Sequence, residues 1–132
     1  MTKRLLMICF AIGMLMLASI ACEASASTAN ISSVVLTADP ATAAATTTFT
    51  PDQTFYAVVT LANAPDTTKV KAVWSSVDDA GTATQLAEKE IVGSASPISF
   101  NATNSNPWPA GKYRVDIYMN DTINKTIDFT VQ

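Results

Sequence analysis

The sequence has 132 residues, of which 48% are hydrophobic and only 14% are charged. That length leaves room for one domain once an export signal is removed. The chain contains no histidine, so it lacks the commonest general base, metal ligand and pH-sensitive side chain. From Cys22 onward it carries six Lys and Arg against eleven Asp and Glu, a net charge of −5. An acidic domain of this kind repels nucleic acid.

The N-terminus has the order of a secretory signal peptide. Lys3 and Arg4 form a basic start, residues 5–20 form an uncharged apolar run, and small residues follow. The run is short for a transmembrane helix, and no basic stop-transfer residue follows it. We therefore expect residues 1–21 to be a helical signal that directs export of the protein.

Two cleavage sites compete at the end of this signal. Cys22 follows a small alanine, as in the lipobox of bacterial lipoproteins, although Ser19 stands where that motif usually has leucine. The other site is the A-x-A sequence at residues 24–26, which would release a soluble extracellular or periplasmic protein. We favour acylation of Cys22. The lipid would then anchor the domain to the cell membrane through a polar tether at residues 22–30.

Residues 31–132 show the period-two alternation of strands that have one buried and one solvated face. Residues 55–61, 70–74, 113–119 and 127–131 alternate most clearly, and turn residues such as Asn120-Asp121 separate the strands. Residues 85–91 alternate poorly because Leu86 and Ile91 fall on opposite faces, so a strand there requires a bulge. About seven short strands in this length predict an all-β fold, a single antiparallel immunoglobulin-like sandwich.

The immunoglobulin pattern assigns particular residues to the core. Trp74 lies on the third expected strand, where such a core has its buried tryptophan, and Tyr113 stands at the position of the tyrosine corner. Val59 or Ala57, together with Val115, takes the place of the two cysteines of an antibody domain. Because the only cysteines are Cys9 and Cys22, we expect aliphatic packing instead of a disulfide. The expected structural core is Trp74, Tyr113, Val59, Val115 and Phe129.

Four stretches of the domain carry a wider resemblance. They are residues 49–59, which run from Phe49-Thr50-Pro51-Asp52 to Val59, then 69–74 (KVKAVW), 108–118 (WPAGKYRVDIY) and 129–131 (FTV). Together they resemble a poorly characterised family of short bacterial lipoproteins with a C-terminal immunoglobulin-like domain. The resemblance covers most of residues 31–132 and implies the sandwich fold. It implies no activity, because one sandwich hosts many functions.

Three aromatic residues are candidate partner contacts. Trp108 lies between two prolines in the loop before Tyr113. Its ring either contacts a protein or a sugar, or plugs the end of the sandwich, and we favour the plug. Tyr56 and Tyr118 fall on the outward faces of their strands. Two outward aromatics either form a binding patch or are ordinary strand formers on a wet face, and we favour the second interpretation.

No motif in the sequence indicates a catalytic or metal site. The serines and threonines have no histidine to activate them, and neither Ser-x-x-Lys nor Gly-x-Ser-x-Gly is present. Asp78 and Asp79 are adjacent, which is typical of a solvated turn. Glu88 and Glu90 share one strand face while Lys89 lies on the other, which is typical of an exposed acidic edge. We expect no catalytic residue, no metal and no cofactor.

The sequence therefore predicts a non-catalytic module of the cell envelope rather than an enzyme. We expect a binding or structural role with an envelope protein or a polysaccharide as the partner. A lipid at Cys22 would link the module to the membrane, and nucleic acid is not an expected partner. The alternative is a small secreted inhibitor or accessory factor of an envelope enzyme. The fold alone does not decide between these roles.

Overall fold

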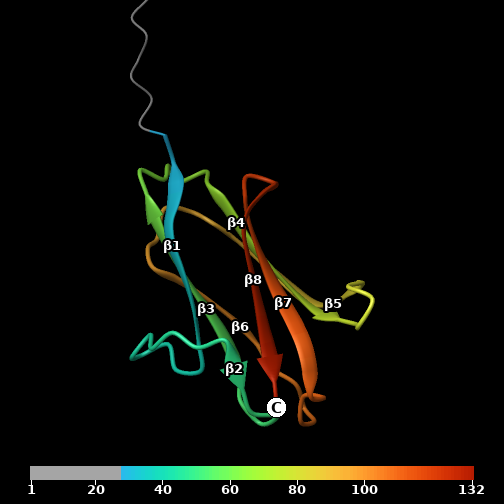
Figure 1. The fold of residues 1–132 in the computed structure, drawn as a ribbon. Helices are drawn as coiled ribbons and strands as arrows, with labels where there is room; N and C mark the ends of the chain where they lie inside the picture. Colours follow the sequence, from blue (N-terminus) through green and yellow to red (C-terminus); the bar gives the residue numbers. More distant parts are fainter. Residues whose placement is uncertain (1–27) are drawn as a thin grey trace, which may run out of the picture.

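Two β-sheets pack face to face in residues 28–132, which are the residues that the computed structural model describes (Figure 1). One sheet has three strands, in the order β1 (Asn30–Thr37), β3 (Phe55–Ala62) and β6 (Ile98–Ala102). The other has five strands, in the order β2 (Thr48–Phe49), β8 (Thr122–Val131), β7 (Gly111–Met119), β4 (Lys69–Val77) and β5 (Ala83–Val92). The expected signal at residues 1–21, the acylation site Cys22 and most of the tether lie outside the described residues.

The predicted all-β immunoglobulin-like sandwich is confirmed, with one strand more than the seven expected. The additional strand is β2, which has two residues and pairs in parallel with the end of β8, with Thr48 opposite Thr130 and Phe49 opposite Val131. All other strand pairs are antiparallel. Because Cys9 and Cys22 both precede residue 28, no disulfide joins the two sheets of the domain. No helix within residues 28–132 is long and apolar enough to cross a membrane.

The core follows from the alternation along the strands. In β3, buried residues alternate regularly with half-buried ones, and β7 alternates in the same way from Tyr113 to Ile117. This pattern turns one face of each sheet toward the other, where apolar side chains leave water. All of the residues expected in the core are buried between the sheets: Trp74, Tyr113, Val59, Val115 and Phe129, together with Ala57.

Phe55, at the start of β3, is the centre of an aromatic cluster that joins the two sheets. The centre of its ring lies 4.6 Å from that of Trp108, 4.8 Å from that of Phe129 and 4.9 Å from that of Phe49. Trp74 and Tyr113 complete the cluster at 6.1 Å and 5.7 Å. Tilted, edge-to-face and offset rings at such distances attract one another beyond their simple burial. Because Phe55 belongs to the three-stranded sheet and most of its partners to the five-stranded sheet, the cluster links the two layers.

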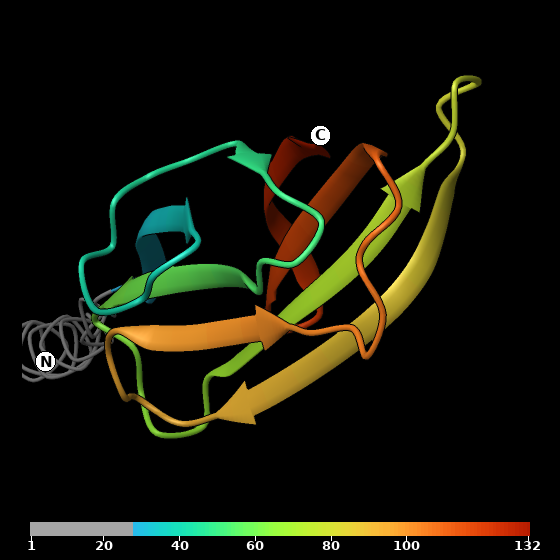
Figure 2. The same cartoon turned by 90° about the horizontal axis from the view of Figure 1, so that it is seen from below.

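The edge strand β5 extends beyond the three-stranded sheet, and the hairpin that it forms with β4 projects from the body of the sandwich (Figures 1 and 2). Nine of its ten residues are exposed and Ile91 is half-buried. The expected bulge is present, because Trp74 lies opposite Ala87 while Ser75 lies opposite Gln85, which leaves Leu86 as the additional residue. The irregular alternation of residues 85–91 therefore reflects a real interruption of the strand.

Replacing Phe55 with alanine should lower the free energy of unfolding by about 3–5 kcal/mol, because a cavity would open among the rings of the five-stranded sheet and of Trp108. Phe55→Leu keeps most of the volume and should cost less than about 1.5 kcal/mol. The exposed residue Ser99 on β6 provides the control, and Ser99→Ala should stay within about 0.5 kcal/mol of the wild type. Urea unfolding measures all three. Equal unfolding midpoints for Phe55→Ala and the control would show that the ring does not hold the sheets together.

Candidate functional site

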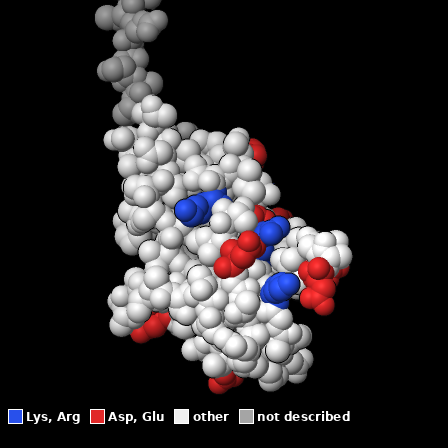
Figure 3. All heavy atoms as spheres, viewed as in Figure 1, with Lys and Arg blue, Asp and Glu red and all other residues white. Residues whose placement is uncertain are grey.

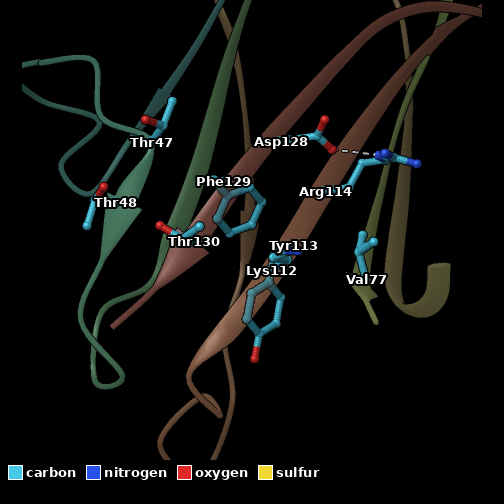
Figure 4. Close-up of a pocket in the computed structure, with 9 residues that line it drawn as sticks. All are labelled: Thr47, Thr48, Val77, Lys112, Tyr113, Arg114, Asp128, Phe129 and Thr130. Carbon is cyan, nitrogen blue, oxygen red and sulfur yellow. Dashed lines mark hydrogen bonds and ion pairs between the residues drawn. The ribbon is translucent and has the colours of Figure 1, made fainter. Parts of the chain in front are cut away.

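A groove of about 370 Å³ lies on the outer face of the five-stranded sheet, where β2, β8, β7 and β4 meet (Figure 4). On β7, Tyr113 and Val115 point into the core, so Lys112 and Arg114 point to the outer face. Lys112 lies opposite Thr130 on β8 and opposite Val77 on β4. The side chains available to a ligand in this groove are Lys112, Arg114, Asp128, Thr47, Thr48 and Thr130.

An ion pair between Arg114 and Asp128 fixes one wall of the groove. The two residues lie directly opposite each other on β7 and β8, and the Nε–H of Arg114 donates a hydrogen bond of 2.7 Å to Oδ1 of Asp128 (Figure 4). The hydrogen bond and the charge of Asp128 raise the pKa of Arg114, so the guanidinium stays cationic. This bond occupies one of the five N–H donors of arginine. The N–H groups of the two terminal nitrogens, Nη1 and Nη2, remain available to a ligand.

The opposite wall consists of threonines that the backbone holds in place. The backbone N–H of Thr130 donates to the carbonyl of Thr47 at 2.9 Å, and the backbone N–H of Gln132 donates to the carbonyl of Phe49 at 3.0 Å. Figure 4 shows Thr47, Thr48 and Thr130 on the side of the groove away from Arg114. Their hydroxyls both donate and accept hydrogen bonds. The groove therefore combines hydroxyls on one side with cations on the other.

Lys112 supplies a more mobile charge beside the fixed guanidinium. Its Nζ lies 3.9 Å from Oδ1 of Asp79, and both side chains are largely exposed, so this contact is weak. A ligand carboxylate that binds Lys112 therefore breaks only this weak ion pair with Asp79. Asp128, the acidic group that lines the groove, is already bonded to Arg114 and does not activate a threonine hydroxyl. The arrangement supports binding rather than bond breaking.

Trp108 plugs one end of the sandwich. Its ring is only 8% exposed and stacks on Phe55, and its Nε1–H donates to the carbonyl of Gln53 at 3.0 Å. The hydroxyl of Tyr113 donates to the carbonyl of Pro109 at 2.6 Å, which holds the same loop. This burial fits the plug that the sequence favours, and a partner contact at Trp108 stays a prediction.

Tyr56 and Tyr118 lie on the outer faces of different sheets, so the two rings do not form a shared patch. Tyr56 belongs to β3 and Tyr118 to β7, and both are half-buried. The Nζ of Lys71 lies 4.8 Å from the centre of the Tyr118 ring, which is a cation–π contact within the sheet surface. Neither tyrosine lines the groove, and their positions on two different sheets fit the favoured interpretation of both as ordinary strand formers.

The groove was not recognisable in the sequence because its walls come from distant segments. Arg114 and Asp128 are separated by 14 residues, and Thr47 and Thr48 end a low-complexity stretch that has the composition of a loop. The one part of the groove that the sequence indicates is the pair of cations on β7, because Lys112 and Arg114 both fall on the outward face of that strand. Only the strand order brings the threonines of β2 and β8 beside these two cations.

Charged side chains within strands are confined to the five-stranded sheet. The strands β1, β3 and β6 contain none, whereas β4 carries two lysines and β5, β7 and β8 carry both signs. In Figure 3, blue and red atoms alternate in the centre and right of the view, while the left side, where Figure 1 places β1, is mostly white. Within residues 28–132, no three acidic or cysteine side chains gather in a way that would hold a metal ion.

Comparison with solved structures supports the fold assignment. The domain is similar to an immunoglobulin-like protein from Pseudomonas aeruginosa, with a TM-score of 0.56 and 14% sequence identity over 82% of this chain and 99% of that chain. At this identity the similarity establishes the fold and nothing more. No family model and no curated protein sequence matches the chain. Membership of the lipoprotein family that the sequence resembles therefore stays a hypothesis.

A second solved structure gives a weaker match. An alkylpurine DNA glycosylase from Pseudomonas fluorescens, solved with DNA that contains an abasic-site analogue, matches with a TM-score of 0.49 and 16% identity. The match covers 79% of this chain but only 30% of that enzyme. A similarity at this level carries no argument about function.

The buried hydroxyl of Tyr113 should make the domain sensitive to alkali. Burial raises the pKa of Tyr113 above its usual value near 10. The unfolded chain therefore loses this proton at a lower pH than the folded domain, and stability falls as the pH rises above about 10. Urea unfolding between pH 8 and 11 should show this loss in the wild type and a smaller loss in Tyr113→Phe. Identical slopes for the two proteins would contradict a buried phenol.

Proposed function

We propose that the protein is a non-catalytic immunoglobulin-like binding module of the cell envelope whose partner occupies the groove on the five-stranded sheet. The observation that carries this proposal is the pairing of a fixed guanidinium, at Arg114, with the threonine wall of the same groove. Its volume of about 370 Å³ falls in the range of small-ligand sites. Recognition sites are typically built in this way, with a few oriented polar groups on a rigid frame.

The partner that suits these groups presents carboxylates together with hydroxyls. The fork of a guanidinium binds a carboxylate through two parallel hydrogen bonds, and Lys112 adds a second positive charge two residues away on the same strand face. Threonine hydroxyls match the hydroxyls of a sugar. An envelope polysaccharide that contains uronic acid therefore fits these groups best among the polysaccharide and protein partners expected from the sequence. The domain is acidic overall, but at physiological salt the repulsion from distant acidic groups is screened and the two cations of the groove act locally.

Binding of polygalacturonate to the mature protein tests this proposal. Arg114→Gln removes the fork while leaving a residue of similar length, and it should weaken binding at least tenfold, the loss of about one charge-assisted hydrogen bond. Lys125→Ala removes an exposed lysine from β8 outside the groove and should leave the affinity unchanged. Isothermal titration calorimetry at constant salt measures both variants.

Equal weakening by the two variants would show that only general charge attracts the polymer, and the groove would be excluded as the binding site. Lack of polygalacturonate binding by the wild type would also overturn the assignment of a uronate ligand. The alternative role as an inhibitor of an envelope enzyme makes a different prediction, because the purified protein would then lower the activity of that enzyme in envelope extracts.

The proposed location in the envelope rests on the sequence before residue 28. If Cys22 is acylated, the wild type should sediment with membranes, and Cys22→Ala should move to the soluble fraction. Cys9→Ala changes the other cysteine, which lies within the apolar run, and should leave fractionation unchanged. Immunoblots of separated membrane and soluble fractions measure the outcome. Cys22→Ala protein that stays with the membranes would contradict the lipid anchor.

A further inference from the structure

The outer edge of β5, in the β4–β5 hairpin, is an unpaired and exposed strand edge. β5 is the last strand of the five-stranded sheet, and nine of its ten residues are exposed. The turn end of its hairpin with β4 projects from the body of the sandwich (Figure 2). Leu86 and Val92 on this strand are 45% and 58% exposed, and they are two of the three large apolar residues exposed within residues 28–132; the third is Ile123 on β8. An unpaired strand edge is a template on which another strand adds hydrogen bonds.

The backbone groups on this edge can be identified from the hydrogen bonds at the ends of the hairpin. The N–H of Gly93 donates to the carbonyl of Thr68 at 2.9 Å, one step beyond the pair formed by Lys69 and Val92. Bonded and non-bonded pairs alternate along antiparallel strands. Residues 87, 89 and 91 therefore bond to β4. Glu88, Glu90 and Val92 direct their N–H and C=O groups away from the sheet.

The side chains along the edge alternate in charge between the two faces. Glu90 lies opposite Lys71, whose side chain is on the outer face of the sheet, so Glu88 and Glu90 point to the outer face. Lys89 lies opposite the buried Ala72 and points to the inner face, beyond the reach of the three-stranded sheet, where it is exposed. A strand that pairs with this edge meets acid, base and acid in succession.

A second copy of the chain fits this edge poorly. Two copies of β5 would pair antiparallel through Glu88, Glu90 and Val92, because only these residues offer free backbone groups between the bulge and the strand end. Pairing centred on position 88, 89 or 90 places a glutamate against a glutamate, and centring on Lys89 also opposes two lysines. Pairing centred on Ile91 or Val92 avoids these contacts but leaves Glu88 opposite residues beyond the end of β5, so that at most two of the three free residues of each edge pair. Like charges directly opposite each other destabilise a strand pair. The occupant is therefore a strand with the reverse order of charges.

We infer that the edge of β5 binds an extended segment of a partner protein, antiparallel, with a basic–acidic–basic triplet facing Glu90, Lys89 and Glu88. The bulge at Leu86 ends the regular edge on one side, so the segment pairs with residues 87–92. Two apolar residues before the triplet face Val92 and Ile91, of which Val92 is 58% exposed. Main-chain hydrogen bonds supply affinity, and the charge order supplies selectivity. This site is separate from the groove.

A pair of peptides tests the inference with the mature protein. One contains Val-Val-Lys-Glu-Lys, and the control contains Val-Val-Glu-Lys-Glu, which has the opposite charge order. The first should bind at least tenfold more tightly and shift the amide resonances of residues 87–92 in NMR spectra. The triple variant Glu88→Lys/Lys89→Glu/Glu90→Lys should reverse this preference. Equal affinity of the two peptides for the wild type, or resonance shifts located elsewhere, would overturn the proposal.

Proline at position 90 provides a second test that keeps the fold. The N–H of Glu90 faces away from the sheet, and proline is tolerated on an edge strand at such a position. Glu90→Pro should melt within a few degrees of the wild type and bind neither peptide. Lys89→Pro interrupts the bonds to β4 and should lower the melting temperature, which verifies the assignment of the free positions. Tight peptide binding by Glu90→Pro would refute strand addition. Arg114→Gln should bind the first peptide as the wild type does.

Discussion

The ring of Phe55 makes the contact on which the relation of the two sheets depends. The domain has no cysteine with which to tie its layers together, so aromatic packing performs this task. Phe55 enters from β3 and meets rings from β2, β4, β7, β8 and the loop that carries Trp108. Each ring removes a large apolar area from water, at about 25 cal/mol per Å², and the tilted and edge-to-face geometries add to that gain. Movement of any one of these elements would disturb contacts with several others.

The same cluster determines the rigidity of the groove. Tyr113 and Phe129 stack with a centroid separation of 5.6 Å in the core, and their chain neighbours Lys112, Arg114, Asp128 and Thr130 stand on the opposite face of the same strands. The packing of Tyr113 and Phe129 in the core therefore fixes the positions of the groove residues on the other face of β7 and β8. Most of β5 lies beyond the cluster, and nine of its ten residues are exposed, while Ile91 packs against the core. One molecule thus offers a rigid concave surface and a projecting strand edge, which suit ligands of different chemistry.

The fold was predictable because strict alternation marks most strands. Residues 55–61 and 113–119 alternate in sequence as they do in burial, and Asn120 and Asp121 adopt the positive φ angles that a tight hairpin needs. The two-residue strand β2 gave no such signal, because parallel pairing with β8 places it. The position of Trp108 depends on the carbonyl of Gln53, 55 residues earlier. The groove and the separation of Tyr56 from Tyr118 likewise follow from strand order, which alternation does not encode. Export and acylation of Cys22 stay predictions from the sequence.

Quenching of tryptophan fluorescence by iodide tests the aromatic cluster most directly. The chain has two tryptophans, Trp74 and Trp108, which are 2% and 8% exposed and both pack against Phe55. Iodide does not enter a packed core, so the emission of the folded mature protein should be almost insensitive to iodide and become sensitive after unfolding in urea. Quenching of the folded protein as strong as that of the unfolded chain would place both indoles in solvent. The sandwich would then have no aromatic centre.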